Sequence, residues 1–313
     1  MQIWKRILLQ LLYKIIMVFT IRNFAAFLLS LWYIVTGRVS RSVNRALKGE
    51  YILSVYFHNP DKRLFVSCLK WLSHRGFHFI SLNDLNKIRT GLVPFPKGAV
   101  LLTVDDGWKS NKSNIIEVVK RMNIPITIFL TVDPVVNGAP FWWSYIKSAR
   151  EKGLIPFSLA QLKEMEHARV QDIINTLKNT IVLGREAMTE DQILEALSDG
   201  QLTIGSHTIS HPILTNCTDD HVYNEMYESK ERLENLFNIP VISFAYPNGA
   251  YSSREVEFLK KVGYTMAFTT ELKPITPDSF ENQYELPRME VLEHVSFPET
   301  ICRMSGVWQT SKV

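Results

Sequence analysis

Short continuous apolar runs alternate with segments of helical periodicity along most of this chain. The apolar runs, typical of strands buried on both faces of a parallel sheet, lie at 51–57, 77–80, 100–104, 126–131, 202–206, 241–246, 264–269 and 284–291. Helical spacing of apolar residues is found between them, at 61–75, 81–89, 110–122, 219–237 and 252–262. The alternation predicts an α/β fold in which helices cover a mostly parallel sheet, either a barrel or a doubly wound sheet.

One stretch, 133–200, interrupts this alternation. It opens with prolines, a glycine and an aromatic cluster at 141–145, and then has helical patterns at 158–182 and 189–198. We interpret it as a helical insertion near the mouth of a site, within the domain 51–313, rather than as a separate domain.

Charge and apolar residues together distinguish the N-terminal segment. Residues 1–50 carry eight Lys or Arg side chains against one acidic residue, a net charge of +7, whereas the remaining 263 residues sum to −3. The apolar runs in this segment, 7–19 and 24–36, are both shorter than the roughly 20 residues that cross a bilayer. We predict a membrane-associating helical segment that lies in the membrane interface. A helical hairpin packed on the domain, and a single span around 15–36 that places the body outside, are the alternatives.

Composition narrows the classes of function. Hydrophobic residues make up 46% of the chain, which excludes a disordered protein. No basic stripe continues into the body, so nucleic acid is not an expected partner. The three cysteines, Cys68, Cys217 and Cys302, are far apart in sequence and give neither a disulfide framework nor a CxxC metal signature. We interpret them as ordinary buried thiols.

Two carboxylates follow the apolar run at 100–104. Asp105 and Asp106 are adjacent and precede Gly107, which permits a sharp exit from the strand. The carboxyl end of a strand is where α/β sheets and barrels place their active sites, and neighbouring carboxylates ionise together only when a cation or donor offsets them. A helix cap after the strand is the alternative interpretation.

Two histidines follow another apolar run, at 202–206. His207 and His211 are four residues apart, so one helical turn would bring both imidazoles to one face. Two imidazoles and a carboxylate form a sound ligand set for zinc or another first-row divalent metal. A third apolar run ends in the turn Tyr246–Gly249, which can present backbone N–H groups to a substrate.

The motifs Thr-Val-Asp-Asp-Gly, Ser-His-Thr-Ile-Ser-His and Tyr-Pro-Asn-Gly, in this order, resemble those of the polysaccharide deacetylases of carbohydrate esterase family four, the NodB-homology domain. The resemblance runs from about Tyr51 to Val291, nearly the whole body. It implies a distorted (β/α) barrel and the hydrolysis of acetyl groups on glycans.

The resemblance also implies roles for individual residues. By motif position Asp105 is the general base, and Asp106, His207 and His211 are the metal ligands. A carboxylate beside a metal site can take a proton from water that the metal has acidified.

Substrate contacts follow from the same resemblance. The backbone N–H of Asn248 is expected to stabilise the oxyanion, and Leu214 to line the pocket for the acetyl methyl. Tyr246 and Trp142 complete the expected substrate-binding residues.

The chain departs from the family pattern in two places. Many members have an arginine in the third motif that orients the base, and here that position is Ala245. Arg288 resembles an arginine that some subfamilies use instead, so we predict that it pairs with Asp105; a solvated arginine at a strand end is the alternative. The late motif that supplies the general acid is a poor match, and His294 is the one C-terminal histidine left for this role.

Together these features predict a metal-dependent enzyme that removes N-acetyl or O-acetyl groups from a polysaccharide or glycan intermediate. The basic N-terminal segment predicts a lipid-linked substrate and a location on the cytoplasmic face of a bacterial inner membrane. Two other functions stay open: a catalytically silent sugar-binding or assembly protein of polysaccharide biosynthesis, and a metal-dependent hydrolase of small amides.

Overall fold

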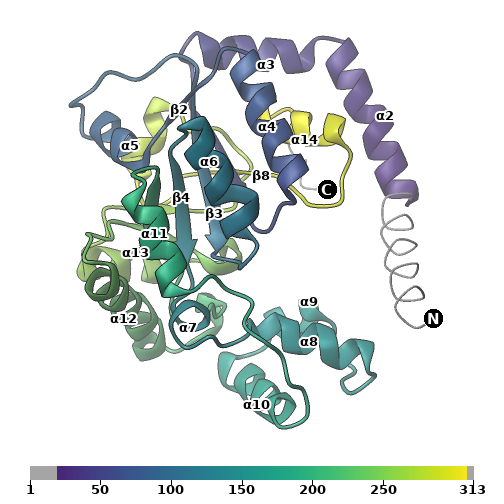
Figure 1. Ribbon diagram of the computed structural model, residues 1–313, viewed down its shortest axis with the longest axis vertical. Coiled ribbons are helices and arrows are strands. Elements are labelled where there is room, and N and C mark those ends of the chain that lie inside the picture. The colour runs from purple at the N-terminus through teal and green to yellow at the C-terminus, as the bar shows by residue number, and fades with distance from the viewer. Residues whose placement is uncertain (1–19, 309–313) are drawn as a thin grey trace.

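The computed structural model describes residues 20–308, and their strands form one parallel sheet (Figure 1). The strands are β1 (Leu53–Phe57), β2 (His78–Ile80), β3 (Ala99–Asp106), β4 (Ile126–Leu130), β5 (Leu202–Ser206), β6 (Ser243–Ala245), β7 (Met266–Phe268) and β8 (Met289–Glu290). Their order is β7-β6-β5-β4-β3-β1-β8, with β2 beside the start of β3. Each predicted apolar run contains one of these strands.

The segment that leads into β8 closes the sheet into a distorted barrel. Leu286 donates its backbone N–H to Ala267 of β7, at 2.9 Å, and accepts a hydrogen bond from the N–H of Thr269, also at 2.9 Å. Three residues later the same segment becomes β8, where Met289 is paired with Val55 of β1. The two ends of the strand order are therefore joined, and the predicted (β/α) barrel is confirmed.

The strand residues alternate between the inside of the barrel and the surrounding helices. Leu102 and Val104 of β3 join the apolar cluster under the helices, whereas Leu101 joins a second cluster, which strands on all sides of the barrel share. Side chains of one strand alternate between its two faces. Thr103 and Asp105 therefore face the interior of the barrel with Leu101, and this places a carboxylate at the upper end of that interior.

Helices cover the outside of the sheet. They are α4 (Lys62–His74), α5 (Leu82–Arg89), the π-helical turn η1 (Lys112–Ile116) with α6 (Glu117–Met122), α12 (Asp219–Phe237), α13 (Ser253–Val262) and α14 (Phe297–Met304). Short 3₁₀ turns lie at η2 (Leu214–Asn216), η3 (Pro247–Gly249) and η4 (Pro277–Asn282). Side-chain caps start several helices: Asp61 accepts from the N–H of Leu64, and Ser81 forms a capping box with Asp84.

The insertion has an apolar core of its own. The helices of the insertion are α7 (Val132–Val136), α8 (Trp142–Glu151), α9 (Leu159–Lys163), α10 (His167–Lys178) and α11 (Glu190–Ser198). Residues of α8, α9 and α10 form a cluster that is distinct from the two barrel clusters, and these helices project beyond the carboxyl ends of β3 and β4 (Figure 1). The prediction of one helix over 158–182 is wrong, because residues 164–166 separate α9 from α10.

The N-terminal helices pack on the body. They are α2 (Ile21–Val35) and α3 (Arg38–Leu47). α2 lies along α14, where Arg22 forms an ion pair with Glu299 at 2.9 Å, and Val43 of α3 belongs to the main core. The predicted apolar run at 7–19 lies outside the described residues, and the division of the chain at residue 50 stays a prediction.

The localisation predicted from the sequence needs correction. Among residues 20–308 no helix is both long enough and apolar enough to cross a membrane, so the single-span anchor around 15–36 is not supported. The physical reason is length: α2 has 15 residues, about 22 Å at the rise of an α-helix, against a hydrocarbon core about 30 Å thick. The location at the inner membrane has no other support.

Gly205 of β5 provides a test of the packing inside the barrel. A Cβ atom at this position would lie 2.4 Å from the ring of Phe129 and 2.8 Å from Oγ of Ser243. Because overpacking a core forces its neighbours to shift, we expect Gly205→Ala to lower the free energy of unfolding by about 1–3 kcal/mol. Urea unfolding measures this. Gly184→Ala is the matched control, since no atom lies within 4 Å of its added Cβ. Equal midpoints for the two variants would contradict the packing described here.

Candidate active site

A cavity of about 830 Å³ opens at the carboxyl ends of the strands. Its floor includes Asp105 and Asp106 at the end of β3, and His207 and His211 after β5. The insertion supplies part of its wall through Trp142 and its neighbours in α8. The structure therefore brings together the four residues that the sequence singled out for chemistry.

Arg288 pairs with Asp105 inside the barrel, as predicted. Its guanidinium donates two hydrogen bonds to the carboxylate, Nη1 to Oδ1 at 2.7 Å and Nη2 to Oδ2 at 2.9 Å. Nε donates to the carbonyl oxygen of Thr269 at 3.1 Å, and Nη1 also reaches Oγ1 of Thr103 at 3.2 Å. The arginine is 0% exposed and its guanidinium lies 4.4 Å from the ring centroid of Tyr56. The alternative of a solvated arginine is wrong.

This pairing determines the charge of Asp105. Burial alone would raise the pKa of the carboxyl, but the charge of Arg288 and its hydrogen bonds to the carboxylate outweigh burial and lower the pKa to about 2. Asp105 is therefore an anion at neutral pH, held in one orientation by a bidentate contact.

Asp106 faces the two histidines instead. Its Oδ1 lies 3.6 Å from Nε2 of His207 and 3.6 Å from Nε2 of His211, and it is buried without a hydrogen-bond partner. Nδ1 of His207 donates to the carbonyl oxygen of Ala245 at 2.7 Å, which leaves the Nε2 lone pair directed to Asp106. Burial lowers the pKa of both histidines, so both imidazoles are neutral, the form that binds metal.

These three side chains fit a divalent metal ion. One ligand atom from each of Asp106, His207 and His211 lies within 4.8 Å of the others. A metal ion would provide the missing partner for Oδ1 of Asp106, which has no hydrogen bond among the described contacts. Two imidazoles and one carboxylate with room for further ligands are typical of a catalytic metal site.

The predicted helical turn between the two histidines is wrong. Residues 207–213 form an irregular loop, in which Thr208 and His211 have left-handed φ values of 67° and 59°. The loop nevertheless brings the two rings to a centroid separation of 4.7 Å. Glu225 of α12 holds it, because its carboxylate accepts hydrogen bonds from the N–H of Ile209 at 2.7 Å and from the N–H and hydroxyl of Ser210 at 3.0 and 2.6 Å.

Three further residues contribute to the site and were missed in the sequence. Trp108 donates its indole N–H to Oδ2 of Asp106 at 2.8 Å, and Lys163 of the insertion donates to the side-chain oxygen of Asn248. Glu225 is the third. Only Trp108 had a local signal, since it follows the Asp-Asp-Gly motif directly; the other two look like ordinary polar positions of helices.

The remaining predicted site residues separate into two groups. Trp142, Tyr246 and Asn248 line the cavity; the indole of Trp142 donates to the carbonyl oxygen of His211 at 2.9 Å, and the hydroxyl of Tyr246 donates to the carbonyl oxygen of Tyr284 at 3.0 Å. Leu214 is buried in η2 and His294 is 57% exposed in its side chain. Neither lines the cavity, so the structure does not bring them to the other residues.

Comparison of this chain with known proteins identifies its family. The family described as polysaccharide deacetylase matches residues 93–267. This match covers more than half of the chain, and the chain belongs to the polysaccharide deacetylase family.

Its relatives include proteins from several bacteria. The putative polysaccharide deacetylase YxkH of Bacillus subtilis is 24% identical over 230 residues, 74% of this chain and 64% of that protein. The poly-beta-1,6-N-acetyl-D-glucosamine N-deacetylase of Staphylococcus epidermidis is 26% identical over 230 residues, 72% of this chain and 66% of that protein. This chain thus spans just under two thirds of the length of each relative.

Solved structures share the fold. The structure of IcaB from Ammonifex degensii matches with a TM-score of 0.60 at 18% identity, over 82% of this chain and 97% of that chain. The Streptococcus pyogenes deacetylase PplD, solved in complex with acetate, matches with a TM-score of 0.59 at 18% identity, over 82% of this chain and 98% of that chain.

The buried ion pair between Arg288 and Asp105 can be tested by measuring the free energy of unfolding of variants. Arg288→Met leaves the carboxylate of Asp105 buried and uncompensated, so we expect the free energy of unfolding to fall by about 3–5 kcal/mol. Adding Asp105→Asn removes the orphaned charge and should restore a large part of this loss. Arg22→Met is the control: its partner Glu299 keeps Arg303 at 2.8 Å, so the loss should stay below about 1 kcal/mol. Equal unfolding midpoints for the two arginine variants in urea would refute the assignment.

Proposed function

We propose that this protein is a metal-dependent N-deacetylase that hydrolyses the acetamide groups of an N-acetylated polysaccharide and releases acetate. The main observation in support of this proposal is that two adjacent carboxylates have different partners. Asp105 is paired with a buried arginine, whereas Asp106 faces two neutral imidazoles with an orphaned oxygen. Such a pair can serve as a base and a metal ligand at one reacting centre.

Asp106, His207 and His211 would hold the metal. We propose zinc, which suits two imidazoles and a carboxylate, although other first-row divalent ions bind the same ligands. When bound, the ion supplies a Lewis acid that makes the acetamide carbonyl more electrophilic and a nearby water more acidic. The contact from Trp108 to Oδ2 of Asp106 leaves Oδ1 for the ion.

Asp105 is the proposed general base. It takes one proton from the attacking water, whose oxygen adds to the acetyl carbon before the C–N bond breaks. Arg288 fixes the orientation of the carboxylate through two hydrogen bonds, so the base does not have to be ordered during the reaction. The backbone N–H of Asn248 is the proposed donor to the oxyanion.

The leaving amine needs a proton as the C–N bond breaks. His294 was the sequence candidate, but its side chain does not line the cavity. His58, which directly follows β1, does line it and lies at the same end of the barrel as Asp105. We therefore propose His58 in preference to His294 as the proton donor.

The shape of the cavity supports a glycan substrate. Its volume of about 830 Å³ lies toward the upper end of the range of about 300–1,000 Å³ for ligand pockets, which leaves room for a substrate larger than a small amide. Trp142 and Trp143 offer aromatic surface on the insertion side, and Lys147 and Glu151 offer polar contacts. Relatives carry names that specify poly-beta-1,6-N-acetyl-D-glucosamine, which favours an N-acetyl over an O-acetyl substrate. A lipid-linked substrate stays a prediction.

Acetate release tests the proposed function. We expect the purified full-length chain to release acetate from β-1,6-linked N-acetylglucosamine oligomers. Asp105→Asn should lower kcat by about 10²–10⁴-fold, because it removes the base, while the bound metal stays. His78→Ala, which changes an exposed histidine of β2, is the control with unchanged turnover. If the Asp105→Asn variant released acetate at the wild-type rate, Asp105 could not be the general base. No acetate from a panel of N-acetylated glycans would favour the silent sugar-binding alternative.

Metal content tests the ligands independently of turnover. His207→Ala removes one of the three proposed ligands, so elemental analysis should find one equivalent of zinc less per chain than in the wild type. His78→Ala should retain the wild-type content, and circular dichroism should show that both variants are folded. Unchanged zinc in a folded His207→Ala protein would contradict the ligand set.

A further inference from the structure

A second cluster of metal-binding side chains lies outside the active-site cavity. His167 is the first residue of α10, Cys217 follows η2, and His221 lies in the first turn of α12. One ligand atom from each of the three lies within 4.8 Å of the others, and the two imidazole rings have a centroid separation of 4.4 Å. This cluster could not be predicted from motif spacing, because 50 residues separate His167 from Cys217.

The surroundings of this cluster favour a cation. A separate cavity of about 640 Å³ is lined by all three side chains and by two carboxylates, Glu164 and Glu166. Nε2 of His221 is buried without a hydrogen-bond partner, and a buried polar atom of this kind calls for a ligand. Within residues 20–308 the thiol of Cys217 makes one hydrogen bond, to the carbonyl oxygen of Ile213 at 3.4 Å.

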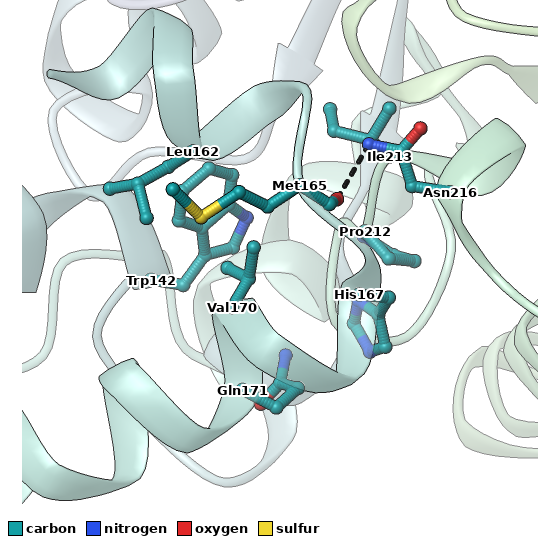
Figure 2. A pocket seen from close by; sticks show the side chains of 9 residues that line it. All are labelled: Trp142, Leu162, Met165, His167, Val170, Gln171, Pro212, Ile213 and Asn216. Carbon is teal, nitrogen blue, oxygen red and sulfur yellow. Dashed lines mark hydrogen bonds between the residues drawn. The ribbon is translucent and has the colours of Figure 1, made fainter. Parts of the chain in front are cut away.

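The cluster lies where the insertion meets the metal-binding loop. Figure 2 shows His167 close to Pro212, the residue after the predicted ligand His211. In the same view the side chain of Asn216 donates to the carbonyl oxygen of Met165 at 2.8 Å. The junction therefore consists of α9–α10 residues on one side and residues 212–217 on the other.

We propose that His167, Cys217 and His221 bind a structural zinc ion that ties the insertion to the barrel. Two imidazoles and a thiolate are a ligand set that zinc prefers, and the thiol proton is released to solvent on binding. The buried position of Cys217 argues against a nucleophile that must reach a substrate.

Such an ion would also support the active-site loop. Nε2 of His221 lies 3.5 Å from Oε1 of Glu225, the carboxylate that accepts hydrogen bonds from Ile209 and Ser210. The imidazole of His221 and the active-site loop therefore share Glu225 as a neighbour. One ion would thus hold α10 and, through α12, the loop that carries His211.

Cobalt substitution distinguishes this site from the catalytic one. The ligands Asp106, His207 and His211 include no sulfur, so a near-ultraviolet thiolate-to-cobalt charge-transfer band can come only from a cysteine ligand. We expect full-length protein loaded with Co²⁺ to show this band. Cys217→Ser should abolish the band and remove one equivalent of zinc, whereas His207→Ala should retain the band and lose the other equivalent.

Two outcomes would overturn the proposal: no thiolate band in wild-type protein saturated with Co²⁺, or a band that persists in Cys217→Ser. If the serine variant does not fold, His167→Gln replaces it, with the same expected loss of one zinc equivalent and a shifted or weakened band. His74→Gln is the matched histidine control, since His74 is exposed at the end of α4. The band reports only on a thiolate ligand, so its result is independent of whether acetate is released.

Discussion

The ion pair between Arg288 and Asp105 is the contact on which the site and the barrel both depend. It crosses the interior from the segment that closes the barrel to β3, between residues 183 positions apart in the chain. Both side chains are removed from water, so either one alone would be a buried charge with a cost of several kcal/mol. The closing segment and β3 therefore stabilise each other only when both are in place.

The same pair explains how two adjacent carboxylates can coexist. Successive residues of a strand point to opposite sides, and Asp106 departs further from the strand with a φ of 73°. Asp105 therefore meets a permanent positive charge inside the barrel, whereas Asp106 meets two neutral histidines at its rim. Each carboxylate acquires a different chemistry from its surroundings, although the two side chains are identical.

The periodicity of apolar residues and the order of the motifs were sufficient to predict the strands and the residues at their ends. The pairing of Arg288 with Asp105 followed from the resemblance of Arg288 to an arginine that some subfamilies of the family use. Spacing could not specify the path between His207 and His211, because a helical turn and an irregular loop can both bring residues four apart together. The left-handed conformation of Thr208 has no sequence signal, since a non-glycine residue occupies it. Glu225 supports this loop from a helix position that looks merely polar.

The separate apolar core of the insertion has a consequence for how the protein can diverge. The helices α8, α9 and α10 bury their side chains largely against one another, so substitutions there need not be matched by changes in the barrel. The residues at the floor of the cavity are held by the barrel, while part of its wall belongs to helices with a separate apolar core. The wall of the cavity can therefore change in evolution at a different rate from its floor.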